Sequence, residues 1–473
     1  MRLLALGLAI ISLFATGSGT AGPADLPVGM PAKFDLNAID AHVADVVARK
    51  GITGLALAVV RDGQVVLAKG YGVRSRETGM PVEPETPFGV GSVTKQFACA
   101  SILLLAEDGK LSVDDKVSKY FPGLTRGDEI TLHQLMTHTS GYPDYYPLDF
   151  VDRRMHREIA ADDLIRQFAG GKLDFEPGSR WSYSNTGYIM LGRVVEKVSG
   201  QSFGDFLKSR IFPPAGMVHA ELDPSGTDPS RARGYLEFAL GAPEPARPEG
   251  TGWLTAAGGL WASAPDVARW DIALMSGQIL KPAFLRVMAE PVKLTDGRTW
   301  PYGCGINIAR NSGEAFYSHG GAVSGFRATN ILIPRTRSAV VVLMNDEQSD
   351  GGIATAIANL IIKEGTSVDV PRVVGPIAKD AALDFFHQMR DGSLDRSKLG
   401  EEFSEYLTAA RVEAASARLK PLGEPSRVEV LNVGERGGME VASIRLTFPS
   451  AVLTGLMYRS TDGKIQQLLF DKG

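Results

Sequence analysis

The strongest constraint on the fold is a pair of β-hairpin patterns that lie far apart in the chain. In each, two short apolar runs flank a turn sequence, which predicts paired antiparallel strands. The runs are Leu55–Val60 and Val65–Ala68 around Asp62-Gly63, and Ala328–Ile333 and Ser338–Met344 around residues 334–337. Helical patterns over Leu36–Lys50 and Ile353–Lys363 flank the hairpins. We expect an α+β fold. The two hairpins, from the beginning and the end of residues 36–363, would form one antiparallel sheet flanked by helices, with a helical region inserted between them.

The pattern changes after residue 363. Residues 364–376 contain two glycines and two prolines without clear periodicity, which is typical of a linker. Two helical stretches and four strand patterns follow, at Ala381–Arg390, Glu401–Leu419, Val428–Val433, Glu440–Phe448, Leu453–Arg459 and Ile465–Phe470. We predict a separate α+β domain over residues 377–473, which weakly resembles cystatin-like and nuclear-transport-factor-like folds. That resemblance implies a topology and no function.

Residues 1–21 have the features of a secretory signal peptide. Arg2 supplies a positive charge, Leu3–Ala15 form a short apolar stretch, and small residues at 19–21 permit cleavage before Gly22. No later stretch is long and apolar enough to predict a membrane span. We therefore expect residues 22–363 to be the main domain of a periplasmic or secreted protein.

Charge and residue usage argue against several partners and cofactors. The net charge is −4, from 50 basic and 54 acidic residues, which gives no electrostatic argument for nucleic acid. Cys99 and Cys304 lie in apolar segments and are expected to be buried free thiols, although export would permit them to pair. The seven histidines show no metal-ligand spacing, so we predict no metal and no cofactor. The oligomeric state stays open.

Ser92 and Lys95 form a Ser-x-x-Lys motif at the start of an apolar stretch that predicts a buried helix to about Glu107. A spacing of three places both side chains on one helical face. Burial and the helix N-terminus both disfavour a charged lysine, so Lys95 can lose its proton and accept one from the serine. The alternative is an N-cap serine followed by a surface lysine.

A second motif, Tyr183-Ser184-Asn185, lies in a polar loop before a predicted helix over Tyr188–Val198. A phenol beside a lysine ammonium has a lowered pKa and can transfer protons. The Asn185 amide can position the carbonyl side of a substrate. The alternative is a turn with a packed tyrosine.

A third motif, His319-Gly320-Gly321-Ala322, lies in a predicted strand. Glycines here would let a substrate backbone approach closely, which makes Gly321 a substrate-binding candidate. The backbone N–H of Ala322 could then join that of Ser92 in an oxyanion hole. The alternative is a bulged strand with a surface histidine.

In chain order, these motifs resemble the serine β-lactamase and penicillin-binding-protein superfamily, and within it the class C β-lactamase, D,D-carboxypeptidase and esterase branch. The resemblance covers roughly residues 34 to 363. It implies a β-lactamase/transpeptidase-like fold and an acyl-enzyme mechanism: Ser92 attacks a carbonyl, Lys95 is the base, and Tyr183 relays protons. Which of Lys95 and Tyr183 is the base is disputed for relatives with these motifs, and the sequence leaves it open. Asn185 and His319 would orient the substrate.

Two positions depart from that branch. Its β-lactamases usually carry lysine in place of His319, and they and the peptidases carry a hydroxyl residue in place of Gly320, which binds the substrate carboxylate. We therefore expect a serine hydrolase of small esters or amides that lack this carboxylate. The alternatives are a D,D-carboxypeptidase or D-aminopeptidase acting on peptidoglycan-type peptides, with weak β-lactamase activity, and a non-catalytic scaffold. Intact Ser92, Lys95 and Tyr183 argue against the scaffold.

Two further candidates are expected to have structural roles. Residues 200–204 match a Gly-x-Ser-x-Gly elbow, but a helix precedes them where an elbow needs a strand. Gly200 is therefore expected to end one helix and Ser202 to begin the next. His138 lies in a Thr/Ser/Gly-rich loop and is expected to be structural.

Overall fold

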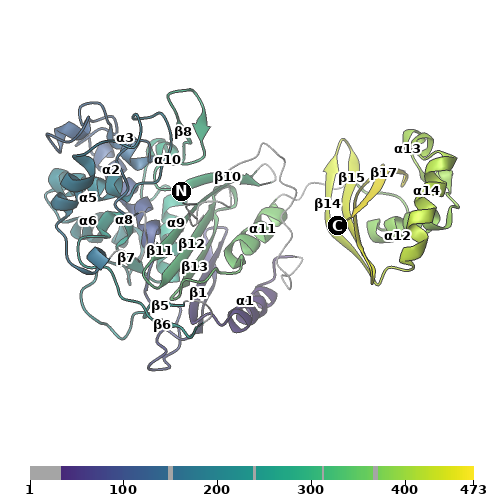
Figure 1. Ribbon diagram of the computed structural model, residues 1–473, viewed down its shortest axis with the longest axis horizontal. Helices are drawn as coiled ribbons and strands as arrows, with labels where there is room; N and C mark the ends of the chain where they lie inside the picture. The colour runs from purple at the N-terminus through teal and green to yellow at the C-terminus, as the bar shows by residue number, and fades with distance from the viewer. Residues whose placement is uncertain (1–32, 147–152, 238–240, 312–313, 366–370, 473) are drawn as a thin grey trace, which may run out of the picture. The chain divides into compact units, whose positions relative to one another are not determined.

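The computed structural model describes residues 33–146, 153–237, 241–311, 314–365 and 371–472 (Figure 1). The chain divides into two compact units, Met1–Gly365 and Thr366–Gly473. The predicted signal peptide over residues 1–21 lies outside the described residues, as do residues 366–370 of the predicted linker. None of the described helices has the length and apolar character needed to cross a membrane.

A six-stranded antiparallel sheet joins the two ends of the first unit, in the order β10-β11-β12-β13-β1-β2. Its strands are β1 (Gly54–Arg61), β2 (Gln64–Gly72), β10 (Asn307–Asn311), β11 (Glu314–Val323), β12 (Phe326–Ile333) and β13 (Ser338–Met344). β1 pairs with β13, with Leu55 opposite Met344 and Val60 opposite Ala339. The early and late hairpins therefore belong to one sheet, which confirms the predicted fold class.

Helices cover both faces of this sheet. β1 is buried almost throughout, and its side chains alternate between two apolar clusters, as the two-residue period of a strand requires. The odd-numbered apolar residues of β1 pack with α1 (Leu36–Lys50) and α11 (Ile353–Gly365), which lie on the same side of the sheet in Figure 1. The even-numbered residues belong to the cluster that contains α2 (Thr94–Glu107) and α9 (Ala264–Met275).

The region between β2 and β10 is the inserted, mainly helical part. Its other helices are α3 (Leu132–Met136), α4 (Ala161–Ala169), α5 (Asn185–Ser199), α6 (Phe203–Arg210), α7 (Phe212–Ala215), α8 (Thr255–Gly258) and α10 (Pro282–Met288). Its short strands are β3 (Phe88–Gly89), β4 (Glu221–Leu222), β5 (Tyr235–Leu236), β6 (Glu244–Pro245), β7 (Leu260–Ala262), β8 (Val292–Lys293) and β9 (Thr299–Trp300). α2 is buried from Thr94 to Leu105 and contacts α5 and α8.

The Gly-x-Ser-x-Gly sequence joins two helices, as predicted. Gly200 ends α5 in the left-handed conformation, and the Ser202 side chain caps α6 by accepting a hydrogen bond from the Asp205 N–H. A nucleophile elbow places its serine between a strand and a helix. Ser202 therefore has the position of a helix cap.

The second unit packs three helices against a four-stranded antiparallel sheet of order β14-β15-β16-β17. Its elements are α12 (Ala378–Asp391), α13 (Glu401–Tyr406), α14 (Ala409–Leu419), β14 (Arg427–Arg436), β15 (Met439–Thr447), β16 (Val452–Arg459) and β17 (Ile465–Lys472). The prediction of one helix over Glu401–Leu419 was wrong. Leu407 ends α13, and the Thr408 side chain caps α14 through the N–H of Arg411, because threonine favours the N-cap over a helix interior.

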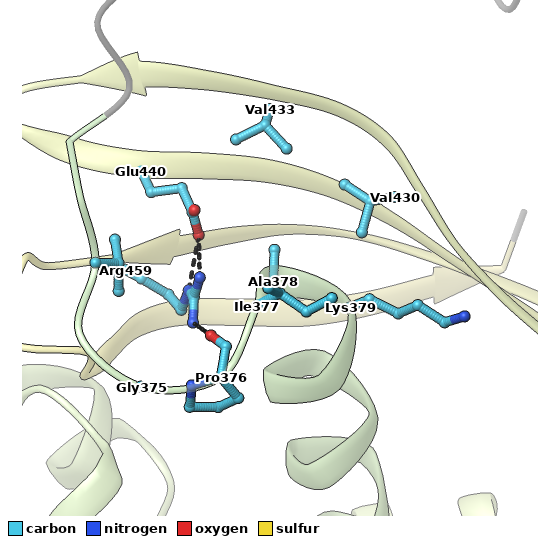
Figure 2. A pocket seen from close by; sticks show the side chains of 10 residues that line it. Gly375, Pro376, Ile377, Ala378, Lys379, Val430, Val433, Glu440 and Arg459 are labelled. Carbon is cyan, nitrogen blue, oxygen red and sulfur yellow. Dashed lines mark hydrogen bonds and ion pairs between the residues drawn. The ribbon is translucent and has the colours of Figure 1, made fainter. Parts of the chain in front are cut away.

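A small pocket of the second unit lies where the chain enters α12 (Figure 2). Arg459 of β16 is buried there, and its Nη2 and Nε donate to the Glu440 carboxylate of β15 at 2.6 and 2.7 Å. Its Nη1 donates to Pro376 O at 2.6 Å. The guanidinium therefore ties the segment before α12 to two strands of the sheet.

Candidate active site

The Ser-x-x-Lys motif lies at the entry to α2, the buried helix of the first unit. A 3-10 turn, Gly91–Val93, leads directly into α2, so Ser92 precedes the helix and Lys95 is its second residue. Lys95 is 0% exposed, and its Nζ donates to Ser92 Oγ at 3.0 Å. The structure therefore brings the two side chains into direct contact.

Lys95 is surrounded by neutral oxygen atoms. Besides Ser92 Oγ, its Nζ donates to Asn185 Oδ1 at 2.8 Å and to Ala257 O at 2.6 Å. Burial lowers the pKa of Lys95 to about 7, and the charge of Asp144 opposes that fall. Because burial destabilises the ammonium form, Lys95 can take a proton from Ser92 near neutral pH.

Tyr183 approaches the same serine oxygen from the loop before α5. Its hydroxyl donates to Ser92 Oγ at 2.7 Å, and the ring centre lies 4.8 Å from Lys95 Nζ. Ser184 is the N-cap of α5 and Asn185 is its first residue. The start of α5 therefore positions two side chains of the site: Tyr183 contacts Ser92, and Asn185 contacts Lys95.

Two glycines bring β11 against the turn that carries Ser92. A Cβ on Gly321 would lie 1.9 Å from Val90 O and 3.2 Å from Ser92 N, and a Cβ on Gly91 would lie 2.6 Å from Ala322 N. Gly91 also has a φ of 53°, which favours glycine. Only residues without a side chain permit this approach, which an oxyanion hole made by the N–H groups of Ser92 and Ala322 requires.

His319 is directed into the protein. It is 4% exposed, its Nδ1 lies 2.6 Å from Gly320 O, and its Nε2 lies 2.9 Å from the Tyr302 hydroxyl. Burial, followed by the charge of Lys95, lowers the pKa of His319 to about 3, so the ring is neutral at pH 7. Both ring nitrogens have protein partners. The adjacent Gly320 is exposed, and a Cβ there would meet only Ala328 O, at 3.7 Å.

Three contributors to the site were missed by sequence reasoning. The Asp144 carboxylate accepts hydrogen bonds from Asn185, and its position directly after Tyr142-Pro143 is the one signal that could have found it. Tyr302 holds His319 and had no recognisable pattern. Ala257 contributes a backbone carbonyl, for which a sequence carries no signature.

His138 contacts the loop that carries Tyr183, which places it beside the site. Its Nδ1 accepts the Ser184 N–H at 3.1 Å, and its ring centre lies 4.3 Å from that of Tyr183. Burial, with the charges of Lys95 and His319, lowers the pKa of His138 well below its usual value. A neutral His138 therefore holds the loop that carries Tyr183.

The two cysteines are free and buried, as predicted. A hydrogen bond with Cys99, together with burial, raises the pKa of the Cys304 thiol. Among the described residues there is no group of three or more histidine, cysteine, aspartate or glutamate side chains that could hold a metal ion.

Similarity to known proteins identifies the family. The Beta-lactamase family model matches residues 39–362, which include all three motifs. The chain belongs to the Beta-lactamase family. It is therefore an enzyme of the serine hydrolase class, and the predicted resemblance to penicillin-binding proteins is confirmed.

Similar proteins include a penicillin-binding protein and a D-aminopeptidase. The chain is 28% identical over 380 residues to a penicillin-binding protein of Bacillus subtilis strain 168, covering 76% of this chain and 81% of that protein. It is 29% identical over 353 residues to a D-aminopeptidase of Brucella anthropi, covering 72% and 65%. The crystal structure of a penicillin-binding protein from Bacillus halodurans has a TM-score of 0.61 at 27% identity, covering 67% of this chain and 99% of that one.

Proposed function

We propose that this enzyme cleaves ester or amide bonds through an acyl-enzyme on Ser92. The observation that carries the proposal is the position of Ser92 Oγ, which lies 3.0 Å from Lys95 Nζ and 2.7 Å from the Tyr183 hydroxyl. A nucleophilic serine needs a base within hydrogen-bond distance, and here two proton-transferring groups meet that condition.

The steps follow from this geometry. Neutral Lys95 accepts the Ser92 proton while Oγ bonds to the substrate carbonyl carbon, and the N–H groups of Ser92 and Ala322 stabilise the oxyanion. Collapse of this intermediate breaks the C–N or C–O bond, and Tyr183 passes the proton from Lys95 to the departing nitrogen or oxygen. Water then hydrolyses the acyl-serine by the same steps, which frees the acid and restores Ser92. Asn185 keeps Lys95 in place throughout.

The third motif supports substrates without a carboxylate next to the scissile bond. A charge-assisted hydrogen bond to such a carboxylate contributes about 1.5–3 kcal/mol. Gly320 has no side chain to donate one, and His319 is neutral with both nitrogens engaged. Esters and simple amides need no such bond, so this strand favours them over carboxylate-bearing peptides and β-lactams.

A second candidate is the removal of an N-terminal D-residue, the activity named in the D-aminopeptidase relative. One observation favours it. Ser324, two residues beyond Ala322, donates its N–H and hydroxyl to Glu249 Oε1 at 3.1 and 3.0 Å, and the Tyr146 hydroxyl donates to the same oxygen at 2.6 Å. A carboxylate fixed in this way suits the ammonium group of a free N-terminus.

A substrate panel tests both candidates. It compares p-nitrophenyl butyrate, D-alanine p-nitroanilide, a D-Ala-D-Ala peptide and a chromogenic cephalosporin in wild type and Gly320→Thr. We expect the ester or the anilide to have the highest kcat/KM in wild type. We also expect Gly320→Thr to improve the two carboxylate-bearing substrates about tenfold more than the ester. A wild type that prefers the peptide or cephalosporin contradicts this account of the third motif.

A further inference from the structure

Asp144 is a partly buried carboxylate that the proposed mechanism does not use, and it is hydrogen-bonded to Asn185. Its Oδ1 accepts the backbone N–H of Asn185 at 2.9 Å and the side-chain Nδ2 at 3.1 Å. Ser184, the N-cap of α5, makes no side-chain capping bond, and Asp144 satisfies the N–H of the first helical residue. The preceding Pro143 O accepts from the Thr186 hydroxyl at 2.6 Å, which fastens the same loop to α5.

The side-chain amide of Asn185 has a donor end and an acceptor end, and Asp144 determines which end faces Lys95. A carboxylate only accepts, so the NH₂ group must face Asp144 and the oxygen must face Lys95, at 2.8 Å. With the amide reversed, two donors would face each other at Lys95 while an oxygen faced the carboxylate. The contacts therefore form a chain from Asp144 through Asn185 to Lys95 and Ser92.

We propose that Asp144 is a positioning residue of the active site, which fixes the Asn185 amide and thereby holds Lys95 against Ser92. The inference rests on the proposed function, because it acts through the proposed base. It predicts two separable effects of Asp144: an orienting effect through its oxygen and an electrostatic effect through its charge.

The electrostatic effect follows from the groups that face Lys95. These are Ser92 and Cys99 on its own turn and helix, Asp144, His138 and Tyr183 on loops, Asn185 and Tyr188 on α5, and His319 on β11. Both histidines have lowered pKa values and are neutral at pH 7, whereas the charge of Asp144 raises the pKa of Lys95 against the effect of burial. Burial raises the pKa of Asp144 itself, and the hydrogen bonds from Asn185 and the charge of Lys95 oppose that rise. Removing that charge should leave Lys95 easier to deprotonate.

The test measures how fast a fluorophosphonate labels Ser92 as a function of pH, which requires no knowledge of the natural substrate. Asp144→Asn keeps an oxygen acceptor and removes the charge. In the plot of labelling rate against pH, we expect the plateau rate at high pH to stay within about threefold of wild type. The rise from low pH to this plateau, the acidic limb, should move to lower pH by about one pH unit. Asp163→Asn removes an exposed carboxylate of α4 that pairs with Arg166, and should leave the limb in place.

A second variant tests the orienting effect. Asp144→Leu removes the acceptor as well, which frees the Asn185 amide to turn, and we expect the plateau rate to fall about 100-fold. In an Asn185→Ala background the same change should have no further effect, because Asp144 acts through Asn185.

The outcomes separate this inference from the proposed function. An acidic limb that does not move in Asp144→Asn, or a loss in Asp144→Leu that persists without Asn185, overturns the role of Asp144 alone. A wild type that is not labelled at Ser92 overturns the proposed function and this inference together. Thermal melting of each variant shows that the measured rates belong to folded protein.

Discussion

Each unit of the molecule buries a cation, and the two cations have opposite surroundings. Lys95 of the first unit is 0% exposed and donates to three neutral oxygens, those of Ser92, Asn185 and Ala257. Arg459 of the second unit is 2% exposed, and its guanidinium pairs with the Glu440 carboxylate at 2.6 Å. Both cations are therefore buried, but only Arg459 is hydrogen-bonded to a carboxylate.

The difference separates a reactive group from a structural one. A buried charge without a counter-charge is destabilised, and a lysine escapes by losing its proton. Arginine keeps its proton in proteins, so a buried arginine needs a carboxylate to compensate its charge. The surroundings of Lys95 thus favour proton transfer at the expense of stability, whereas those of Arg459 favour a fixed fold.

Of the changes that test this comparison, replacement of Lys95 by methionine, of similar shape, gives the largest expected effect. We expect kcat/KM to fall about 10²- to 10⁴-fold, because the base is lost. The free energy of unfolding should stay the same or rise, since the variant no longer buries an ammonium that lacks a directly paired carboxylate. Kinetics and urea unfolding of the same preparation measure both. An active variant would show that Lys95 is not the base, and a variant destabilised by several kcal/mol would show that Lys95 stabilises the fold.

Arg459→Met should have the reverse effect. It leaves the Glu440 carboxylate without its cation, and we expect the free energy of unfolding to fall by about 3 kcal/mol. The turnover per folded molecule should not change. Adding Glu440→Gln should recover part of the stability because no charge is then left unpaired. A variant as stable as wild type would mean that this pair does not hold the second unit together.

The pH dependence sharpens the comparison further. Because the pKa of Lys95 is lowered to about 7, we expect kcat/KM to rise with pH through 7 and to be about 100-fold below its plateau at pH 5. Between about 7 and the ordinary value of 10.5, the unfolded chain binds more protons at this position than the folded one. Stability from this group therefore rises with pH across that window, and Lys95→Met should abolish the rise. A flat activity profile would contradict the lowered pKa.

The sheet and the Ser92–Lys95 contact could be predicted because both depend on local patterns. Two hairpins at the ends of a segment have few ways to pair, and a spacing of three on a helix brings two side chains together. The outline of the second unit followed from its strand patterns for the same reason. The break at Leu407 was missed because periodicity alone does not reveal that Thr408 caps a new helix.

The remaining parts of the site depend on contacts that no local pattern encodes. His319 was expected to orient substrate, yet Tyr302 and Gly320 O occupy its two nitrogens. The position of His319 in a strand did not reveal that its side chain lies against Tyr302. Asp144 reaches Asn185 from a loop, and the backbone carbonyl of Ala257 reaches Lys95 from α8, so both contacts join residues distant in sequence. Such acceptors are found only in three dimensions.

The central claim is that Ser92 is the nucleophile that Lys95 activates. The most direct measurement treats the protein with a fluorophosphonate and maps the adduct by mass spectrometry, with Ser92→Ala as the matched variant. The account predicts an adduct on Ser92, no adduct in the variant, and a loss of turnover of at least about 10³-fold. An adduct on another serine such as Ser202, or undiminished turnover in Ser92→Ala, would contradict it.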